Sequence, residues 1–345
     1  MAKESNVGGK KRRKGVSYEK YGYFFILPFF LVYGFFQLYP LINTFYWSTF
    51  TYTKRNLIES ISFSGLENFK QILGLIPKET GYFLPYLGNT LIMWIGGFIP
   101  QILLSLLMAA WLSNERVKIR GRGAVKVLTY MPNIITAASI SVLFGALFSQ
   151  YGPITMLMKN MGILSQNYDF LSHVGTTRGL IAFILFWMWY GNTTLLLISG
   201  MMGINPSLYE AAEIDGANGA QSFFKITLPL LKPILLYTLV TSAVGGLQMY
   251  DIPSLFNVNG SSMSGGPADS TTSLSMYIMR LYGADVGRAA AVSVLLFIIT
   301  LAISLCLFGT MGDKDKKLEE KMRKAQTKEY KRQMKAEKSA MKGGN

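Results

Sequence analysis

The hydrophobic residues of this chain fall into long runs separated by short polar segments. A helix needs roughly 20 mostly apolar residues to cross about 30 Å of hydrocarbon. Six runs meet that length, and they lack the alternation that membrane barrel strands show. The pattern therefore predicts an all-α, polytopic membrane protein with six transmembrane helices: Tyr21 to about Ile42, about Pro85 to Leu112, Ala124 to Phe148, Gly179 to Ser199, about Leu230 to Ile252, and Ala289 to Met311.

The composition excludes an ordinary soluble enzyme. Half of the 345 residues are hydrophobic and only 15% are charged, whereas a soluble chain usually carries about 25% charged residues. The single cysteine, Cys306, cannot form an intrachain disulfide. With one histidine, His173, the chain also lacks a His or Cys cluster for zinc or another transition metal. We expect no catalytic and no metal-binding residues.

The basic residues predict how the chain lies in the membrane. If the N-terminus is cytoplasmic, 26 of the 34 Lys and Arg residues fall on the inner side, as the positive-inside rule requires. This asymmetry accounts for most of the net charge of +15, so nucleic-acid binding is not needed to explain it. We expect both termini in the cytoplasm, with a basic N-tail at 1–20, a transmembrane domain at 21–311 and a charged C-tail at 312–345.

The basic run at 10–14 before the first apolar run raises the alternative of a cleaved signal peptide. The apolar run is longer than the roughly 7–15 residues of a signal sequence, and no small-residue cleavage site follows Tyr39-Pro40. An uncleaved first span is the better interpretation.

Polar and aromatic residues inside two of the spans are candidates for a solute pathway. Two interpretations remain open for them. Ser, Thr and Asn also hydrogen-bond between packed helices, and aromatic residues near a membrane interface usually act as anchors. The alternative is a polar route for a hydroxyl-rich solute, with aromatic rings that stack on sugars. The candidates are Trp189, Tyr190, Asn192 and Thr193 in the fourth span, and Gln248 and Tyr250 at the end of the fifth.

The chain shows no means of driving transport by itself. Lys126, Asp251 and Arg288 lie near predicted span ends, so an ion-coupled relay inside the membrane is not evident. The phosphate-binding pattern G-x-x-x-x-G-K-[ST] is also missing. If transport is active, the energy must come from another chain.

The segment at about 204–229, between the fourth and fifth spans, has the pattern of a short helix between two breakers. Asn205 can cap this helix, Pro206 suits its first turn, and Gly216 ends it. Pro229 then blocks helix continuation and redirects the chain toward the fifth span. Small alanines flanked by carboxylates suit docking into a groove with basic groups on a partner: Ala211, Ala212 and Ala217 with Glu210, Glu213 and Asp215.

The spacing of this segment resembles the EAA motif of permease subunits of binding-protein-dependent ABC importers. In that family the loop forms a coupling helix that sits in a cleft of a cytoplasmic ATPase subunit. The resemblance implies a type I ABC importer permease fold for residues 21–311. It assigns coupling to the ATPase to Glu210, Ala211, Ala212, Asp215, Gly216 and Ala217, with Leu228 and Pro229 ending the element.

Shorter matches point to the carbohydrate branch of that family and to its maltose-permease-like first subunit. Each match is weak by itself. The resemblance rests on the occurrence of all of them in this order along the chain. They are Ile26-Leu27-Pro28, Tyr39-Pro40, Gly65-Leu66-Glu67-Asn68-Phe69, Asn89-Thr90, Gly265-Gly266-Pro267 and Ser270-Thr271-Thr272.

The resemblance implies a permease that translocates a sugar or oligosaccharide into the cytoplasm and is not an enzyme. Its expected partners are a second permease subunit, two ATPase subunits, an extracellular solute-binding protein and the lipid bilayer, but no nucleic acid. We expect this chain to bind no cofactor, because ATP and Mg²⁺ are used by the partner ATPase. The expected location is a bacterial-type plasma membrane.

Two other classes remain as alternatives. The first is an ABC importer for another solute, such as a peptide, phosphate or metal. The second is a channel, secondary transporter or membrane enzyme that works alone. An ion-coupled carrier should show intramembrane carboxylates or repeated halves, and an enzyme should show convergent titratable groups.

Overall fold

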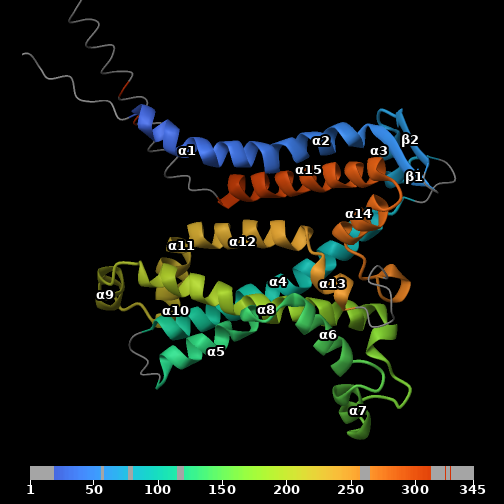
Figure 1. Ribbon diagram of the computed structural model, residues 1–345. Coiled ribbons are helices and arrows are strands. Elements are labelled where there is room, and N and C mark those ends of the chain that lie inside the picture. The colour runs from blue at the N-terminus through green and yellow to red at the C-terminus, as the bar shows by residue number, and fades with distance from the viewer. Residues whose placement is uncertain are drawn as a thin grey trace, which may run out of the picture.

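The computed structural model describes residues 19–55, 58–76, 81–114, 120–256 and 265–311, with residues 323 and 327. Most of these residues are helical (Figure 1). Residues 1–18 and nearly all of the predicted C-tail lie outside the described residues, and so does part of the polar loop before Gly265.

Within the described residues, four helices are long and apolar enough to cross a membrane. The first runs from Tyr21 to Ser48 and comprises α1 (Glu19–Tyr33), η1 (Gly34–Leu38) and α2 (Tyr39–Ser48), so it extends beyond the predicted end at Ile42. The others are α4 (Phe83–Ser113), α8 (Val174–Met202) and α15 (Val286–Met311).

The third and fifth predicted spans are not straight helices. The third breaks into α5 (Arg122–Ile134) and α6 (Ala137–Leu147), which meet at 88°. Ile135 and Thr136 have extended backbones at the break, and Thr136 caps α6 by accepting a hydrogen bond from the Ser139 backbone N–H. The fifth is preceded by a second helical segment at 65°. Six spans result only if each bent pair counts as one.

Prolines explain the irregular turns in two of these helices. η1 and η3 (Phe223–Thr227) are π-helical, and each ends two residues before a proline, Pro40 or Pro229. Proline has no N–H to donate, and its ring clashes with the carbonyl four residues earlier. The wider π turn relieves that clash and lets the helix continue. The chain then stays helical through α11 (Leu228–Leu230) and turns at Leu231 into α12 (Lys232–Leu247).

The remaining elements lie mainly at the two ends of the bundle. One end carries α9 (Ser207–Ile214) and α10 (Gly219–Ser222). The opposite end carries the antiparallel strands β1 (Phe50–Arg55) and β2 (Ile58–Phe63), which pair Phe50 with Phe63. It also carries α3 (Glu67–Leu73), α7 (Pro153–Asn160), η2 (Phe170–Ser172), α13 (Asp251–Leu255), η4 (Pro267–Asp269) and α14 (Leu274–Tyr282).

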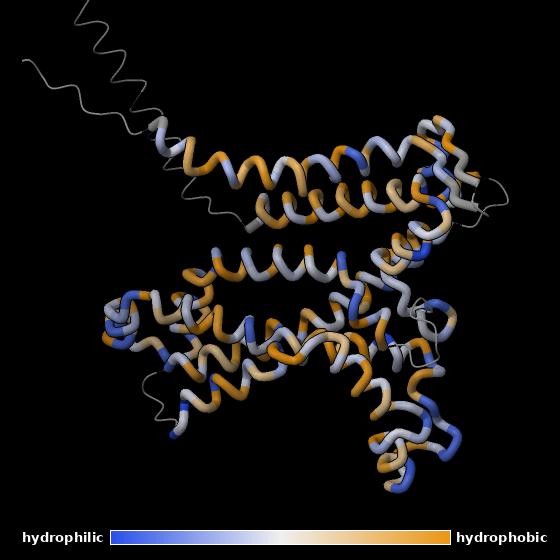
Figure 2. Tube along the Cα trace, in the orientation of Figure 1, coloured by the Kyte–Doolittle hydropathy of each residue, from blue (hydrophilic) through white to orange (hydrophobic). Residues whose placement is uncertain are grey.

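The long helices form two groups with α12 between them (Figure 1). α15 packs along α2, and α8 packs against α4 and α5, while α12 contacts both α15 and α4. Figure 2 shows hydrophobic residues along the long helices and hydrophilic residues concentrated at α9 and at the opposite end of the bundle. This distribution is that of a bundle that lies across a membrane.

α8 holds together the group of long helices formed by α4, α5 and α8. Its side chains and backbone bond to α4, through Gln101 Nε2 to Thr193 Oγ1 at 2.8 Å and Ser105 Oγ to the Tyr190 carbonyl at 2.8 Å. α5 approaches on another side, where a Cβ at Gly191 would overlap the Thr129 carbonyl oxygen. Small residues and interhelical hydrogen bonds are the usual means of packing helices in a membrane, where no hydrophobic force drives them together.

The loop at 265–274 ties the opposite end of the bundle together. Asn89 of α4 donates to the Asp269 carbonyl at 2.9 Å and to the Thr272 carbonyl at 3.2 Å. Arg178 of α8 donates from Nε to the Ser270 carbonyl at 3.0 Å and from a terminal nitrogen to the Asn89 side-chain oxygen at 2.5 Å. The Leu274 backbone N–H donates to Thr90 Oγ1. These bonds hold two helices, α4 and α8, to one loop.

The Asp269 carboxylate holds the loop in an unusual conformation. Ala268 and Asp269 have φ angles of 53° and 55°, in a region that residues other than glycine seldom adopt. Arg280 of α14 pairs with the Asp269 carboxylate at 3.0 Å, and Tyr86 donates to it at 3.3 Å. Burial raises the pKa of Asp269, but hydrogen bonding and charge from Arg280, with further hydrogen bonds from the Gly265 N–H and Thr272, outweigh it and lower the pKa below the usual value of 3.8.

Replacing Gly191 by alanine should destabilise the bundle, because the new Cβ pushes α5 away from α8. The expected cost is about 1–3 kcal/mol, the usual range for overpacking a close contact. Gly179→Ala is the matched control on the same helix, since nothing lies within 4 Å of a Cβ there. Thermal melting of the purified variants measures the difference, and equal melting temperatures would contradict the close approach.

Replacing Asp269 by asparagine should remove an acid-sensitive contribution to stability. A carboxylate whose pKa is lowered by folding stabilises the protein above its unfolded pKa, and that stabilisation is lost as the pH falls through the folded pKa. D269N should therefore melt below wild type at neutral pH, by about 0.5–1 kcal/mol as for a partly exposed ion pair. The gap should close below pH ~4. A gap that persists at acid pH would argue against the carboxylate as its cause.

Candidate functional site

The segment from Asn205 to Ala217 folds into a self-contained exposed helix. Asn205 Oδ1 accepts from the Ser207 backbone N–H at 3.1 Å, and α9 follows. Gly216 ends it with a φ of +76°, a left-handed conformation that glycine adopts without strain. The Ala217 N–H bonds back to the Ala212 carbonyl at 2.8 Å, which satisfies a carbonyl at the helix end. The stop therefore lies where the sequence predicted it, and the helix begins at Ser207, one residue after the predicted start at Pro206.

The predicted coupling residues are grouped on this exposed helix. Glu210, Ala211, Asp215 and Gly216 are exposed, whereas Ala212 and Ala217 are half-buried. Ile214, which the sequence analysis did not single out, is 87% exposed. The Tyr209 hydroxyl meets Thr227 Oγ1 at 2.8 Å and fastens α9 to the π turn η3. The segment thus presents carboxylates, small residues and two apolar side chains, Leu208 and Ile214, together to a partner.

Leu228 and Pro229 do not end this element, contrary to the sequence-based expectation. They lie inside a helical stretch, because the π turn before Pro229 lets the helix continue to Leu230. The change of direction comes at Leu231, just before Pro233, which occupies the first turn of α12. The helical stretch from Gly219 to Leu230, which follows the docking segment, therefore meets α12 at a 65° bend.

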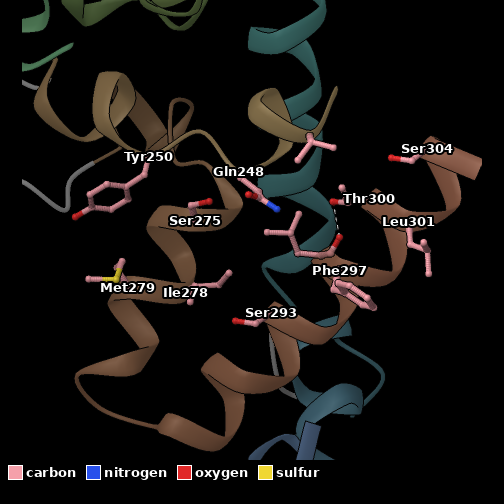
Figure 3. Close-up of a pocket in the computed structure, with 12 residues that line it drawn as sticks. Gln248, Tyr250, Ser275, Ile278, Met279, Ser293, Phe297, Thr300, Leu301 and Ser304 are labelled. Carbon is pink, nitrogen blue, oxygen red and sulfur yellow. Dashed lines mark hydrogen bonds between the residues drawn. The ribbon is translucent and has the colours of Figure 1, made fainter. Parts of the chain in front are cut away.

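A pocket of about 690 Å³ lies between α12, α14 and α15 (Figure 3). Gln248 and Tyr250 are both at this pocket, at the point where α12 ends and the chain turns into α13. The twelve lining residues carry no charge, and half of them are polar. They are Gln248, Tyr250, Ser275, Ser293, Thr300 and Ser304, with Val244, Ile278, Met279, Leu296, Phe297 and Leu301.

The loop at 265–274 is bonded to one wall of this pocket. Ser273 Oγ donates to the Met249 carbonyl at 2.7 Å, so the segment that carries Gln248 and Tyr250 is attached to the start of α14. Ser275, Ile278 and Met279 then face the pocket from α14 (Figure 3). An uncharged wall of hydroxyl, amide and apolar groups suits a neutral solute that has both hydroxyl groups and apolar faces.

The four candidates on α8 do not line this pocket. Thr193 is buried and accepts the hydrogen bond from Gln101, which places it between α4 and α8. Tyr190 is half-buried, and its carbonyl accepts from Ser105. Trp189 and Asn192 are exposed and lie three residues apart, on one face of the helix.

The sequence analysis missed the lining residues of α14 and α15. Ser293, Thr300 and Ser304 fall at positions i, i+7 and i+11 of one helix, so they share a face. That periodicity was the available signal. It does not by itself distinguish a pocket wall from a surface for helix packing.

A family model and several relatives match this chain over most of its length. The model described as binding-protein-dependent transport system inner membrane component matches residues 101–314. The lactose transport system permease protein of Rhizobium radiobacter is 29% identical over 84% of this chain and 94% of the relative. An arabinooligosaccharide permease of Bacillus subtilis is 30% identical over 82% and 86%. A trehalose/maltose permease of Thermococcus litoralis is 31% identical over 83% and 92%.

Solved structures show the same fold. A chain of a bacterial ABC transporter involved in import of the acidic polysaccharide alginate matches with a TM-score of 0.68 and 24% identity. The match covers 85% of this chain and 95% of that one. A second structure, of the alginate transporter with a pentasaccharide-bound periplasmic protein, matches with a TM-score of 0.67. The chain is thus a multi-pass transporter component and not an enzyme, and it belongs to the family of inner membrane components of binding-protein-dependent transport systems.

Proposed function

We propose that this chain is a permease subunit of an ATP-driven importer that moves a sugar or oligosaccharide into the cytoplasm. The observation that carries the proposal is the similarity, over more than four fifths of the chain, to permeases named for lactose, arabinooligosaccharides and trehalose or maltose. The uncharged pocket between α12, α14 and α15 supports a neutral solute. Peptide, phosphate or metal solutes would call for charged or metal-binding groups.

The distribution of charge supports an orientation with both termini in the cytoplasm. α9 lies at the same end of the bundle as the start of α1 and the end of α15 (Figure 1). Most Lys and Arg residues belong to segments that precede α1, follow α15 or connect α4 to α5 and α8 to α12 in the sequence. In this orientation α9 faces the cytoplasm. The paired strands β1 and β2, with α13 and α14, face outward toward the solute-binding protein.

The assembly we propose has a second permease subunit, two ATPase subunits and an external binding protein. The exposed carboxylates and small residues of α9 are the docking surface for an ATPase. ATP and Mg²⁺ are bound by that subunit, and this chain carries no cofactor of its own. Closure of the ATPases shifts the balance between inward-facing and outward-facing states. The Tyr209–Thr227 bond fastens α9 to the helical stretch that begins at Gly219, and this stretch passes the movement through η3 to α12 and the pocket.

The solute pathway we propose runs along α12 and α8. The Gln248 side chain donates hydrogen bonds to solute hydroxyl groups or accepts hydrogen bonds from them. The Tyr250 ring offers a face on which a sugar ring stacks. Trp189 and Asn192 are exposed on α8, where the second permease subunit completes the pathway. Thr193 is bonded within the bundle and acts in packing.

An uptake assay with a panel of labelled solutes tests the proposed function. Cells that lack this chain are complemented with it, and neutral disaccharides, arabinose oligosaccharides, a peptide and phosphate are compared. Restored uptake of one sugar class, abolished by depletion of ATP, is the expected result. Restored uptake of the peptide or phosphate alone would contradict the sugar assignment but not the importer class.

Reversing the charge of Glu210 should uncouple the permease from its ATPase. E210K places a positive charge on α9 where basic groups of the partner are expected, so ATPase recovery in pull-down should fall about tenfold or more. Glu67→Lys is the matched control, since Glu67 is an exposed carboxylate of α3 at the opposite end of the bundle. Equal recovery of the ATPase with both variants would show that α9 is not part of the interface with the ATPase.

Replacing Gln248 by leucine should weaken solute recognition while leaving the fold intact. Loss of one solute hydrogen bond in the pocket is worth about 1–3 kcal/mol, so the KM for uptake should rise by roughly five- to a hundredfold. Thr300→Val is the control in the same pocket, because the Thr300 hydroxyl already bonds to the Leu296 carbonyl of its own helix (Figure 3). An unchanged KM in Q248L would exclude this side chain from the pathway.

A further inference from the structure

The short helix α7 buries Thr155 and Lys159, two of its three polar residues, while its apolar residues are exposed or half-buried. Thr155 and Lys159, one helical turn apart, are 0% and 3% exposed. Leu157 is 58% exposed, and Met161, just after the helix, is 64% exposed. A helix on the surface of a protein in water shows the opposite arrangement, with charged residues outward. The surroundings of α7 are therefore expected to be apolar.

The buried polar groups of α7 are used to hold the segment together. The Lys159 ammonium donates to the Gln150 carbonyl at 3.0 Å and lies 6.0 Å from the centre of the Tyr151 ring. The buried Thr155 hydroxyl has no hydrogen-bond partner among the described residues. Burying the Lys159 ammonium and the unbonded Thr155 hydroxyl away from water costs free energy. That cost is offset if the outward face avoids water.

The exposed apolar face of α7 continues the apolar surface of the span before it. α7 packs against α6, whose Val142 and Leu143 are also exposed. Beyond α7, Ile163 is 59% exposed, and Lys159 is the only charged residue between positions 149 and 168. The apolar surface of a multi-pass membrane protein faces lipid. The outer face of α7 extends that surface at the end of the bundle.

The size and place of α7 exclude a membrane span. Its eight residues cover about 12 Å, far less than the roughly 30 Å of hydrocarbon. It lies at the end of the bundle opposite to α9 and to one side of the long helices (Figure 1). A short helix in this place, with one apolar face, is suited to lie in the membrane interface.

We propose that α7 is an interfacial anchor, with Leu157, Met161 and Ile163 inserted among lipids at the membrane surface opposite to α9. Tyr151 lies at the headgroup level, as aromatic residues of membrane interfaces do. The anchor fixes the outer end of α6, and through the 88° turn it fixes the angle between α6 and α5. This site for lipid is independent of which solute the permease carries.

Fluorescence quenching tests the anchor directly. Cys306→Ser removes the single cysteine, and L157C, M161C or Q166C then carries one bimane label on the assembled importer. Gln166 is the control, because it is an exposed polar residue in the same outer segment. The importer is placed in vesicles of phosphatidylethanolamine and phosphatidylglycerol that contain a lipid with a doxyl group near the head of its acyl chain. Labels at 157 and 161 should be quenched roughly threefold or more above the label at 166.

Two other outcomes would overturn the anchor. Iodide in the water that quenches all three labels equally would show that α7 is surrounded by water. Labels at 157 and 161 that neither quencher reaches, while iodide still quenches the label at 166, would show that another protein covers α7. Since each position is labelled separately at an exposed site, misfolding of one variant leaves the other as a test.

Discussion

A chain that crosses lipid must satisfy its backbone N–H and C=O groups within the protein, because hydrocarbon offers neither donors nor acceptors. The four long helices meet this condition directly. The interrupted spans meet it locally, through the Thr136 cap in one and the π turn before Pro229 in the other. The end of α12 meets it through the hydrogen bond from Ser273 to the Met249 carbonyl. The pocket and the exposed α9 helix both lie beside such interruptions.

This constraint links the two functional regions. From α9 the chain runs through η3 and α11 into α12, and the sixteen residues of α12 span about 24 Å before the helix ends at the pocket. A bent helix transmits a displacement at one end to the other, whereas a disordered linker would absorb it. The bond between Tyr209 and Thr227 attaches α9 to the near end of this connection. The bonds of the 265–274 loop to Asn89 and Arg178 hold the far end against α4 and α8.

Local features of this structure could be predicted from the sequence, and long-range pairings could not. The apolar runs and the stop at Gly216 depend on neighbouring residues, so the four straight spans and α9 were located, although the first span continues six residues beyond its predicted end at Ile42. The break at Ile135 comes three residues after Pro132, whereas a proline disrupts the helical turn that precedes it, so the position of the break was not predicted from the sequence. Asn89 and Thr272 were recognised as parts of separate short motifs, but their contact joins residues 183 positions apart. The buried Lys159 of α7 is likewise visible only after folding.

In the proposed assembly, this chain transmits energy from a separate ATPase to a solute pathway fed by a binding protein. Purification of the chain from its native membrane in mild detergent, followed by an ATPase assay with the co-purified proteins, tests it most directly. Recovery of a second permease and an ATPase, with hydrolysis stimulated by a sugar-loaded binding protein, is the predicted result. A chain that purifies alone and supports uptake without ATP would contradict the account.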